Sequence, residues 1–177
     1  MGDSLTEGLG VDPDEAYPAQ LEARLRREGI NWTVINAGVS GETSSGALTR
    51  LSWILKSNPD AVLLVTGAND GLRGLDPKLT AENLKSIVSE LKKNDIEVML
   101  GGMHALPNLG EDYAQKFNAV YGQVAKQEGV MLIPFFLEGV AREPHLNQED
   151  GKHPTAQGYT KVVEHIYPDV SRWLQGF

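Results

Sequence analysis

Cysteine is absent from the 177 residues, and its absence removes three kinds of chemistry at once. No disulfide can form, no thiolate can bind a metal, and no cysteine can act as a nucleophile. The absence does not indicate a cellular compartment, because a chain of this length can bury a core of ordinary size without disulfides. The length predicts a single domain that covers residues 1–177.

Positive charge and long apolar runs are also scarce. The net charge is −8, with 16 Lys and Arg against 24 Asp and Glu. This balance argues against a nucleic-acid partner, because binding a phosphate backbone needs a surplus of basic residues. The longest apolar run, residues 61–65, is far too short to span a bilayer. We therefore expect a globular chain with no nucleic-acid partner and no membrane span.

Short β-branched runs alternate with longer amphipathic stretches along the chain. Residues 32–35, 61–65, 97–100 and 130–133 are typical of buried strands. Apolar stripes with helical spacing are formed by Tyr17, Leu21 and Leu25; by Leu48, Leu51 and Leu55; by Leu84, Ile87, Val88 and Leu91; by Phe117, Tyr121 and Val124; and by Tyr159, Val162, Val163 and Ile166. Such alternation predicts parallel strands joined by right-handed crossovers. The predicted fold is a three-layer α/β/α sandwich with a central parallel sheet.

Four polar, glycine-containing segments carry most of the chemical information. They are Gly2–Leu5, 36–41 (Asn-Ala-Gly-Val-Ser-Gly), 67–70 (Gly-Ala-Asn-Asp) and 150–154 (Asp-Gly-Lys-His-Pro). The second and third follow predicted strands, and the last lies before the final helical stripe. Ligands of open α/β sheets bind at the carboxyl ends of the strands. These segments are therefore the candidates for a functional site.

The residue types in these segments match the needs of acyl transfer. The hydroxyl of Ser4 needs a base, and His153 suits that task because an unperturbed imidazole, with a pKa of ~6.5, is largely neutral near pH 7. Asp150, three residues before His153, can orient the ring and balance the imidazolium. A developing oxyanion needs donors, which the amide of Asn69 and the backbone N–H groups of Gly41 and Ser4 can supply.

Together the four segments resemble the SGNH hydrolases, also called the GDSL family. The Ser, Gly, Asn and His that name the family's blocks map onto Ser4, Gly41, Asn69 and His153, and Asp150 stands at the acid of the D-x-x-H block. The similarity is greatest to the bacterial branch of thioesterase I, lysophospholipase L1 and arylesterases. In that branch G-D-S-L-T, N-A-G-V-S-G-E-T-S and G-x-N-D-G-L-R-G occur in this order.

The resemblance implies a flavodoxin-like SGNH fold and a cofactor-free serine hydrolase. Its expected substrates are small-molecule carboxylic esters or thioesters with short to medium acyl chains, as for arylesterases, thioesterases and lysophospholipases. It also implies that the loop 103–110 lines an acyl pocket, with Leu106 and Leu109 setting the chain-length preference. Export of many members of this branch favours a periplasmic location, and the oligomeric state stays undetermined.

Two alternatives stay open, a carbohydrate acetylesterase of the same family and a catalytically disabled binding domain. A metal or nucleotide enzyme is not expected. No pair of histidines has ligand-like spacing with a carboxylate, and neither a P-loop nor a Gly-x-Gly-x-x-Gly motif after a strand is present.

One departure from the family pattern concerns the start of the chain. The family places its nucleophile directly after a first β-strand, whereas only Met1 precedes Gly2 here. We therefore expect the first strand to be missing from the sequence, either clipped or with its place filled by another segment. A missing central strand would leave backbone groups of its neighbours unpaired.

Overall fold

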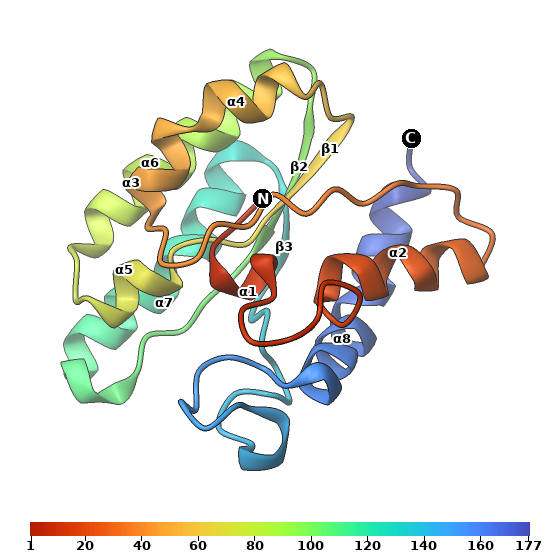
Figure 1. The fold of residues 1–177 in the computed structure, drawn as a ribbon. Coiled ribbons are helices and arrows are strands. Elements are labelled where there is room, and N and C mark those ends of the chain that lie inside the picture. Colours follow the sequence, from red (N-terminus) through yellow and green to blue (C-terminus); the bar gives the residue numbers. More distant parts are fainter. The chain divides into compact units, whose positions relative to one another are not determined.

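The sheet has three parallel strands. The structure, a computed structural model, describes residues 1–177 apart from the side chain of Pro107. Strands β1 (Ala61–Leu64), β2 (Glu97–Gly101) and β3 (Met131–Ile133) lie in the order β1-β2-β3 (Figure 1). In their register Leu63 lies opposite Met99, which in turn lies opposite Met131. The predicted strands at 61–65, 97–100 and 130–133 are confirmed.

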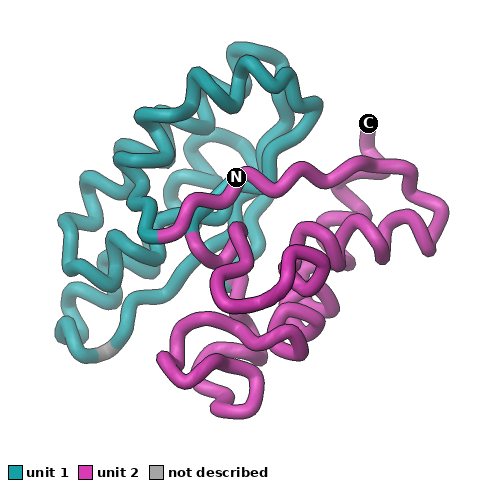
Figure 2. The backbone as a smooth tube through the Cα atoms, in the orientation of Figure 1, with its two compact units in different colours: residues 1–3, 41–135 teal, residues 4–40, 136–177 magenta. Residues whose placement is uncertain are grey.

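The chain divides into two compact units (Figure 2). The first consists of Met1–Asp3 and Gly41–Phe135 and contains the sheet. The second consists of Ser4–Ser40 and Phe136–Phe177 and contains no strand among the residues that the structure describes. Each unit is described in turn.

The helices of the first unit cover its sheet. They are α3 (Ser44–Thr49), α4 (Leu51–Lys56), α5 (Ala68–Leu72), α6 (Pro77–Lys93), the short 3₁₀ turn η1 (Pro107–Leu109) and α7 (Glu111–Glu128). Helices α6 and α7 pack against each other, and both contact β2. Successive residues of a strand point to opposite faces, and Val98, Met99 and Leu100 are all buried. Both faces of β2 are therefore covered, as expected for the middle layer of a sandwich.

The second unit is built on a pair of helices. Its elements are α1 (Ser4–Glu7), α2 (Tyr17–Arg27), the 3₁₀ turn η2 (Pro144–Leu146) and α8 (Ala156–Leu174). Helix α2 packs along α8, and the predicted apolar stripes of both helices are buried. Helix α8 begins after Thr155, whose hydroxyl accepts a hydrogen bond from the N–H of Gly158 at 3.1 Å. The side chain thus satisfies one N–H group that the first helical turn leaves unpaired.

The predicted strand at 32–35 is wrong. Residues 31–37 have no regular secondary structure, and Ile35 is 67% exposed, which a buried strand would not allow. The N–H of Val34 donates to the carboxylate of Glu22 on α2 at 2.5 Å, so a side chain replaces a neighbouring strand as its partner. β-propensity describes fit to a pleated, half-buried surface and does not supply the partner strand.

The stripe predicted from Leu48, Leu51 and Leu55 is also partly wrong. Arg50 separates α3 from α4, and the buried positions are Ala47, Leu51 and Ile54. Leu48 and Leu55 are only half-buried, and the buried stripe uses the residue before each of them.

Residues before Ser4 pair with β1 only briefly. Gly2 forms an isolated parallel bridge with Val65, whose N–H donates to the carbonyl of Met1 at 2.9 Å. Among the described residues no strand precedes Ser4.

Candidate active site

Ser4 begins the single helical turn α1. Its side chain is buried, with 7% of the residue exposed. The N–H groups of the first turn of a helix have no hydrogen-bond partner within the helix. The N–H of Ser4 is therefore not used by the helical hydrogen bonds of α1. Buried Thr6 contacts the hydroxyl of Tyr17 at 3.2 Å and connects this turn to α2. A predicted nucleophile therefore lies at a sharp, buried turn.

His153 and Asp150 lie in a loop that backbone hydrogen bonds close on itself. Asn147 and Pro154 form an antiparallel bridge, and the N–H of Gln148 donates to the carbonyl of His153 at 2.8 Å. Gly151 adopts a φ of +66°, a left-handed conformation that glycine accepts without a steric penalty. The sequence Asp-Gly-Lys-His thus forms a tight loop between η2 and α8, in which the side chains of Asp150 and His153 contact each other.

Three predicted site residues are brought together although Ser4 and His153 lie 149 positions apart. The Oγ of Ser4 is 2.8 Å from Nε2 of His153, and Nδ1 of the same ring is 2.5 Å from Oδ2 of Asp150. The first distance is typical of a hydrogen bond, and the second is shorter than the usual range. The order hydroxyl, imidazole, carboxylate is the arrangement in which a base can remove the serine proton while an acid orients the base.

The carboxylate of Asp150 is held on both oxygens. Desolvation raises its pKa, but the hydrogen bond from the His153 ring and two backbone N–H groups outweigh that effect and lower the pKa to about 2. The N–H groups of Lys152 and His153 donate to Oδ1 at 2.9 and 3.1 Å. Oδ2 is thereby aimed at the imidazole, and the acid remains ionised at any pH where the protein would work.

Gln148 is a residue of this region that the motifs did not reveal. Its Nε2 donates to the carbonyl of Leu9 at 2.8 Å and to that of Pro154 at 2.9 Å. It thereby links the loop after α1 to the loop of His153. Gly10 leaves space for it, because a Cβ there would lie 2.1 Å from the Gln148 amide oxygen. A polar residue directly before an acidic pair carries no distinctive pattern, and only the fold shows this role.

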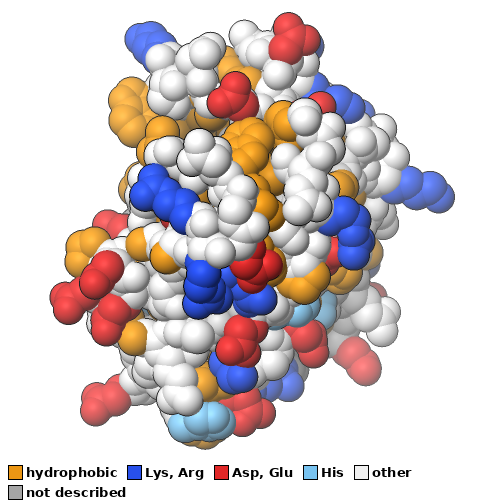
Figure 3. Space-filling view, turned by 90° about the vertical axis from the view of Figure 1, so that its right-hand side faces the viewer, with side chains coloured by type: hydrophobic (Ala, Val, Ile, Leu, Met, Phe, Trp, Pro, Cys, Tyr) orange, Lys and Arg blue, Asp and Glu red, His pale blue; other side chains and the backbone are white. Residues whose placement is uncertain are grey.

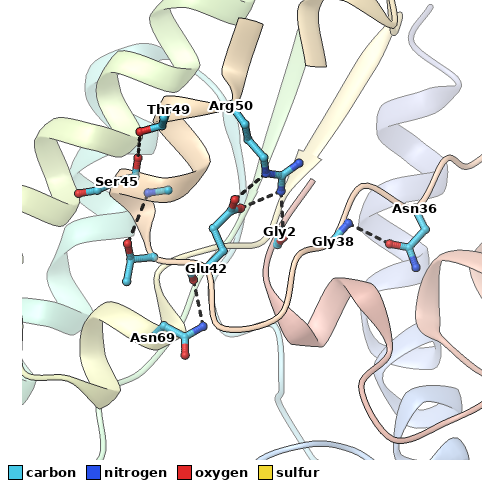
Figure 4. Close-up of polar contacts among 10 residues, drawn as sticks. Gly2, Asn36, Gly38, Glu42, Ser45, Thr49, Arg50 and Asn69 are labelled. Atoms are coloured by element: carbon cyan, nitrogen blue, oxygen red, sulfur yellow. Dashed lines mark hydrogen bonds and ion pairs between the residues drawn. The ribbon is translucent and has the colours of Figure 1, made fainter. Parts of the chain in front are cut away.

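In the first unit, Asn69 lies near the start of α5. The helix begins after Gly67, whose φ of +99° is left-handed. The Nδ2 of Asn69 donates to the carbonyl of Glu42 at 2.9 Å, which orients the amide (Figure 4). Gly41, the residue before Glu42, has a φ of +76°, and its carbonyl accepts a hydrogen bond from Arg73 at 2.8 Å. The structure thus places Asn69 beside the residue that follows Gly41.

Asp70 connects the first turn of α5 to two other helices of the first unit. This fully buried carboxylate accepts hydrogen bonds from the N–H of Ser44 at 2.8 Å and from the hydroxyl of Thr80 at 3.2 Å. The hydroxyl of Ser44 donates to it as well. Because Asp70 follows Asn69 directly, these bonds fix the first turn of α5 against α3 and α6.

Leu106 and Leu109 lie at the short turn η1 and are exposed by 39% and 36%. Leu109 lies beside Gly74, where an added Cβ would be 3.6 Å from its side chain. Exposed leucines on a loop of the first unit are available to contact an apolar ligand. Their predicted role in acyl binding stays a prediction.

Two negative observations apply to the described residues. They contain no group of three or more His, Asp and Glu side chains that could hold a metal ion. No helix formed by them is long and apolar enough to cross a membrane.

On the face drawn in Figure 3, Lys and Arg side chains lie interspersed with Asp and Glu rather than gathered into one basic patch.

Comparisons with known proteins agree on one family. A model described as the GDSL-like Lipase/Acylhydrolase family matches residues 1–161. Esterase TesA of Pseudomonas aeruginosa is 40% identical, over 98% of this chain and 87% of its own length. Thioesterase 1/protease 1/lysophospholipase L1 of Escherichia coli K12 is 38% identical, over 93% of this chain and 78% of its own. The crystal structure of the psychrotrophic esterase EstA from Pseudoalteromonas sp., inhibited by monoethylphosphonate, is 31% identical with a TM-score of 0.94, over 99% of this chain and 96% of that one.

These matches confirm the predicted α/β fold with its parallel sheet, since the similarity to EstA extends over almost the whole of both chains. They also confirm the resemblance drawn from the four motifs, because the matched region contains Ser4, Gly41, Asn69 and His153. The chain therefore belongs to the GDSL-like lipase/acylhydrolase family.

Proposed function

We propose that this protein hydrolyses carboxylic esters and thioesters through an acyl-enzyme formed on Ser4. The observation that supports this most directly is the pair of short contacts at His153, with Ser4 on one ring nitrogen and Asp150 on the other. A nucleophile, a base and an orienting acid are the parts that acyl transfer needs. Relatives named as an esterase and as a thioesterase/lysophospholipase support the same reaction.

In the proposed mechanism the Oγ of Ser4 attacks the carbonyl carbon while Nε2 of His153 accepts the hydroxyl proton. The tetrahedral intermediate collapses, the bond to the leaving oxygen or sulfur breaks, and the imidazolium returns its proton to the leaving alcohol or thiol. Water then attacks the acyl-serine and loses its proton to His153. The bond between the acyl carbon and Oγ of Ser4 breaks, the imidazolium returns the proton to Oγ, and the carboxylic acid leaves. Asp150 holds the ring in the tautomer with a proton on Nδ1 and stabilises the imidazolium.

We assign the oxyanion donors to the N–H groups of Ser4 and Gly41 and to the amide of Asn69. An amide nitrogen carries two N–H groups. The bond from Asn69 to the Glu42 carbonyl can therefore orient the amide through one N–H while the other donates to substrate. This assignment depends on residues 1–177 working as a single domain, which stays a prediction.

The substrates proposed are small molecules with short to medium acyl chains. Leu106 and Leu109 support an apolar acyl site, since both expose apolar surface at η1 and are not part of the buried core. The family relationship supports aryl and thioester substrates as well as lysophospholipids.

The most direct test is covalent labelling with a fluorophosphonate, an analogue of the tetrahedral intermediate. We expect one adduct per chain in intact mass spectra, mapped by peptide sequencing to Ser4, and loss of both the adduct and ester turnover in Ser4→Ala. Folded protein without any adduct would indicate a binding domain instead. Faster release of acetate from an acetylated sugar than from p-nitrophenyl octanoate would indicate a carbohydrate acetylesterase.

A further inference from the structure

Arg50 and Glu42 form an ion pair that connects three segments of the first unit. Arg50, at the junction of α3 and α4, donates from Nε and from one terminal nitrogen to the two carboxylate oxygens of Glu42 at 2.6 and 2.7 Å (Figure 4). The same terminal nitrogen donates to the carbonyl of Gly2 at 3.2 Å. At its other end, Glu42 accepts the Asn69 amide on its backbone carbonyl. Glu42 is therefore held by its carboxylate and by its carbonyl at once.

The pair differs from the surface ion pairs of this chain in geometry and exposure. The side chains of Arg50 and Glu42 are 18% and 7% exposed. By contrast, Arg172 and Asp169 meet at 3.6 Å with 73% and 39% exposed. A two-pronged, largely buried guanidinium–carboxylate pair fixes orientation, whereas exposed pairs contribute little. Glu42, the residue after Gly41, is thus held in one orientation by its ion pair with Arg50.

The neighbouring helix makes room for this arrangement. Gly46, within α3, faces the Glu42 side chain, and a Cβ at Gly46 would lie 2.8 Å from its Cγ. Glycine lowers the stability of a helix interior relative to alanine. Helix stability therefore does not explain glycine at this position, but space for Glu42 does.

We propose that Arg50 is a positioning residue that acts through Glu42 on the oxyanion donor Asn69. Its bonds fix the Glu42 side chain, and the Glu42 carbonyl in turn fixes the Asn69 amide, while Gly41 is the preceding residue in the chain. Donors aimed in advance at the developing charge are the source of this kind of stabilisation, and a displacement of about 1 Å can cost ~10²-fold in rate. The proposal rests on the proposed function, since it concerns the same reaction.

The test is a double-mutant cycle between Arg50→Lys and Asn69→Ala with a p-nitrophenyl ester as substrate. Lysine keeps the charge but cannot form the two-pronged contact. We expect Arg50→Lys to lower kcat roughly tenfold with KM changed less than about twofold, because ground-state binding does not use the donors. In the Asn69→Ala background the same substitution should change kcat less than about twofold, since residues that act as one unit are not additive. Arg172→Lys, the same change in an exposed pair, is the control and should leave kcat unaltered.

Gly46→Ala provides a second, independent variant. Alanine is the better helix former, so this change within α3 should preserve or raise the Tm of the protein. The added Cβ displaces Glu42, so we expect kcat to fall while Tm does not. If Arg50→Lys proves unfolded at the assay temperature, Gly46→Ala decides alone. Unchanged kcat in Gly46→Ala, or an equal loss for Arg50→Lys with and without Asn69, would overturn the proposal. If the wild-type protein is neither labelled at Ser4 nor able to hydrolyse ester, the proposed function itself is contradicted. If the wild type is active and the variants have the same kcat, only the positioning role of Arg50 is contradicted.

Discussion

At the scale of single residues, the candidate triad is defined by how its parts are held. His153 contacts Ser4 through one nitrogen and Asp150 through the other. Asp150 in turn receives two backbone N–H groups on the oxygen that does not face the ring. The loop of residues 150–153 therefore orients the side chains of Asp150 and His153.

Asn69 allows a prediction at this scale. Removing one side-chain donor from an oxyanion hole lowers kcat by roughly 10²–10³. We expect Asn69→Ala to show this loss in steady-state ester hydrolysis, with labelling of Ser4 slowed and the fold retained. Asn31→Ala, at an exposed asparagine, is the control. A loss below about tenfold would show that backbone donors suffice without the amide.

At the scale of elements, the loop that carries His153 is attached to the turn that carries Ser4 by Gln148. Its amide donates to a carbonyl in each connection, at Leu9 and at Pro154. Both segments belong to the second unit, so the contact between nucleophile and base depends on this attachment as well as on their own geometry.

Gln148→Glu tests the attachment with a nearly isosteric change. A carboxylate offers no donor and would face two carbonyl oxygens, so we expect Tm to fall by roughly 2–8 °C and kcat to fall with it. Scanning calorimetry and ester turnover measure the two effects. The same substitution at exposed Gln127 should alter neither, and equal Tm values for the two variants would contradict the role of Gln148.

The turn η1 supports a prediction on specificity. If Leu106 and Leu109 contact the acyl chain, replacing both by alanine should lower turnover of a decanoate ester more than that of a butyrate ester, because longer chains bury more apolar surface. The ratio of kcat/KM for the two esters is the measurement. Leu79→Ala, at a leucine of α6 that is similarly exposed, serves as control. An unchanged ratio in the double variant would remove these residues from the acyl site.

At the scale of the whole molecule, the lowered pKa of Asp150 couples folding to pH. Its pKa falls from the ordinary 3.8 to about 2 in the folded protein, so the unfolded chain binds this proton first as the pH is lowered. A carboxyl with a depressed pKa stabilises the fold above its unfolded pKa and loses that contribution as the pH falls through the folded value.

We therefore expect the stability difference between wild type and Asp150→Asn to be largest above about pH 5 and to shrink steadily toward pH 2. Urea unfolding at several pH values across this range measures it. Asp14→Asn, at an exposed carboxylate, is the control for general charge effects. A difference that stays constant with pH would show that the hydrogen bonds to Asp150 do not favour its ionised form.

Much of the fold was predictable because local patterns carry it. The strands at 61–65, 97–100 and 130–133 are short, mostly apolar runs between turn residues, and this local pattern predicts them. Residues 32–35 carry the same composition without becoming a strand. The difference lies in pairing, since the N–H of Val34 finds a carboxylate on α2, and no local pattern specifies that choice.

For the site, the sequence by itself determined which chemical groups are present and their order along the chain, because motifs fix residue types at fixed spacing. Only the tertiary structure decided that Ser4 meets His153 across 149 positions, that Gln148 links their two loops, and that Arg50 holds Glu42 against Asn69. The physical reason is that these contacts join segments distant in sequence. Hydrogen bonds between such segments form only after the packed core has brought donor and acceptor atoms within about 3 Å of one another.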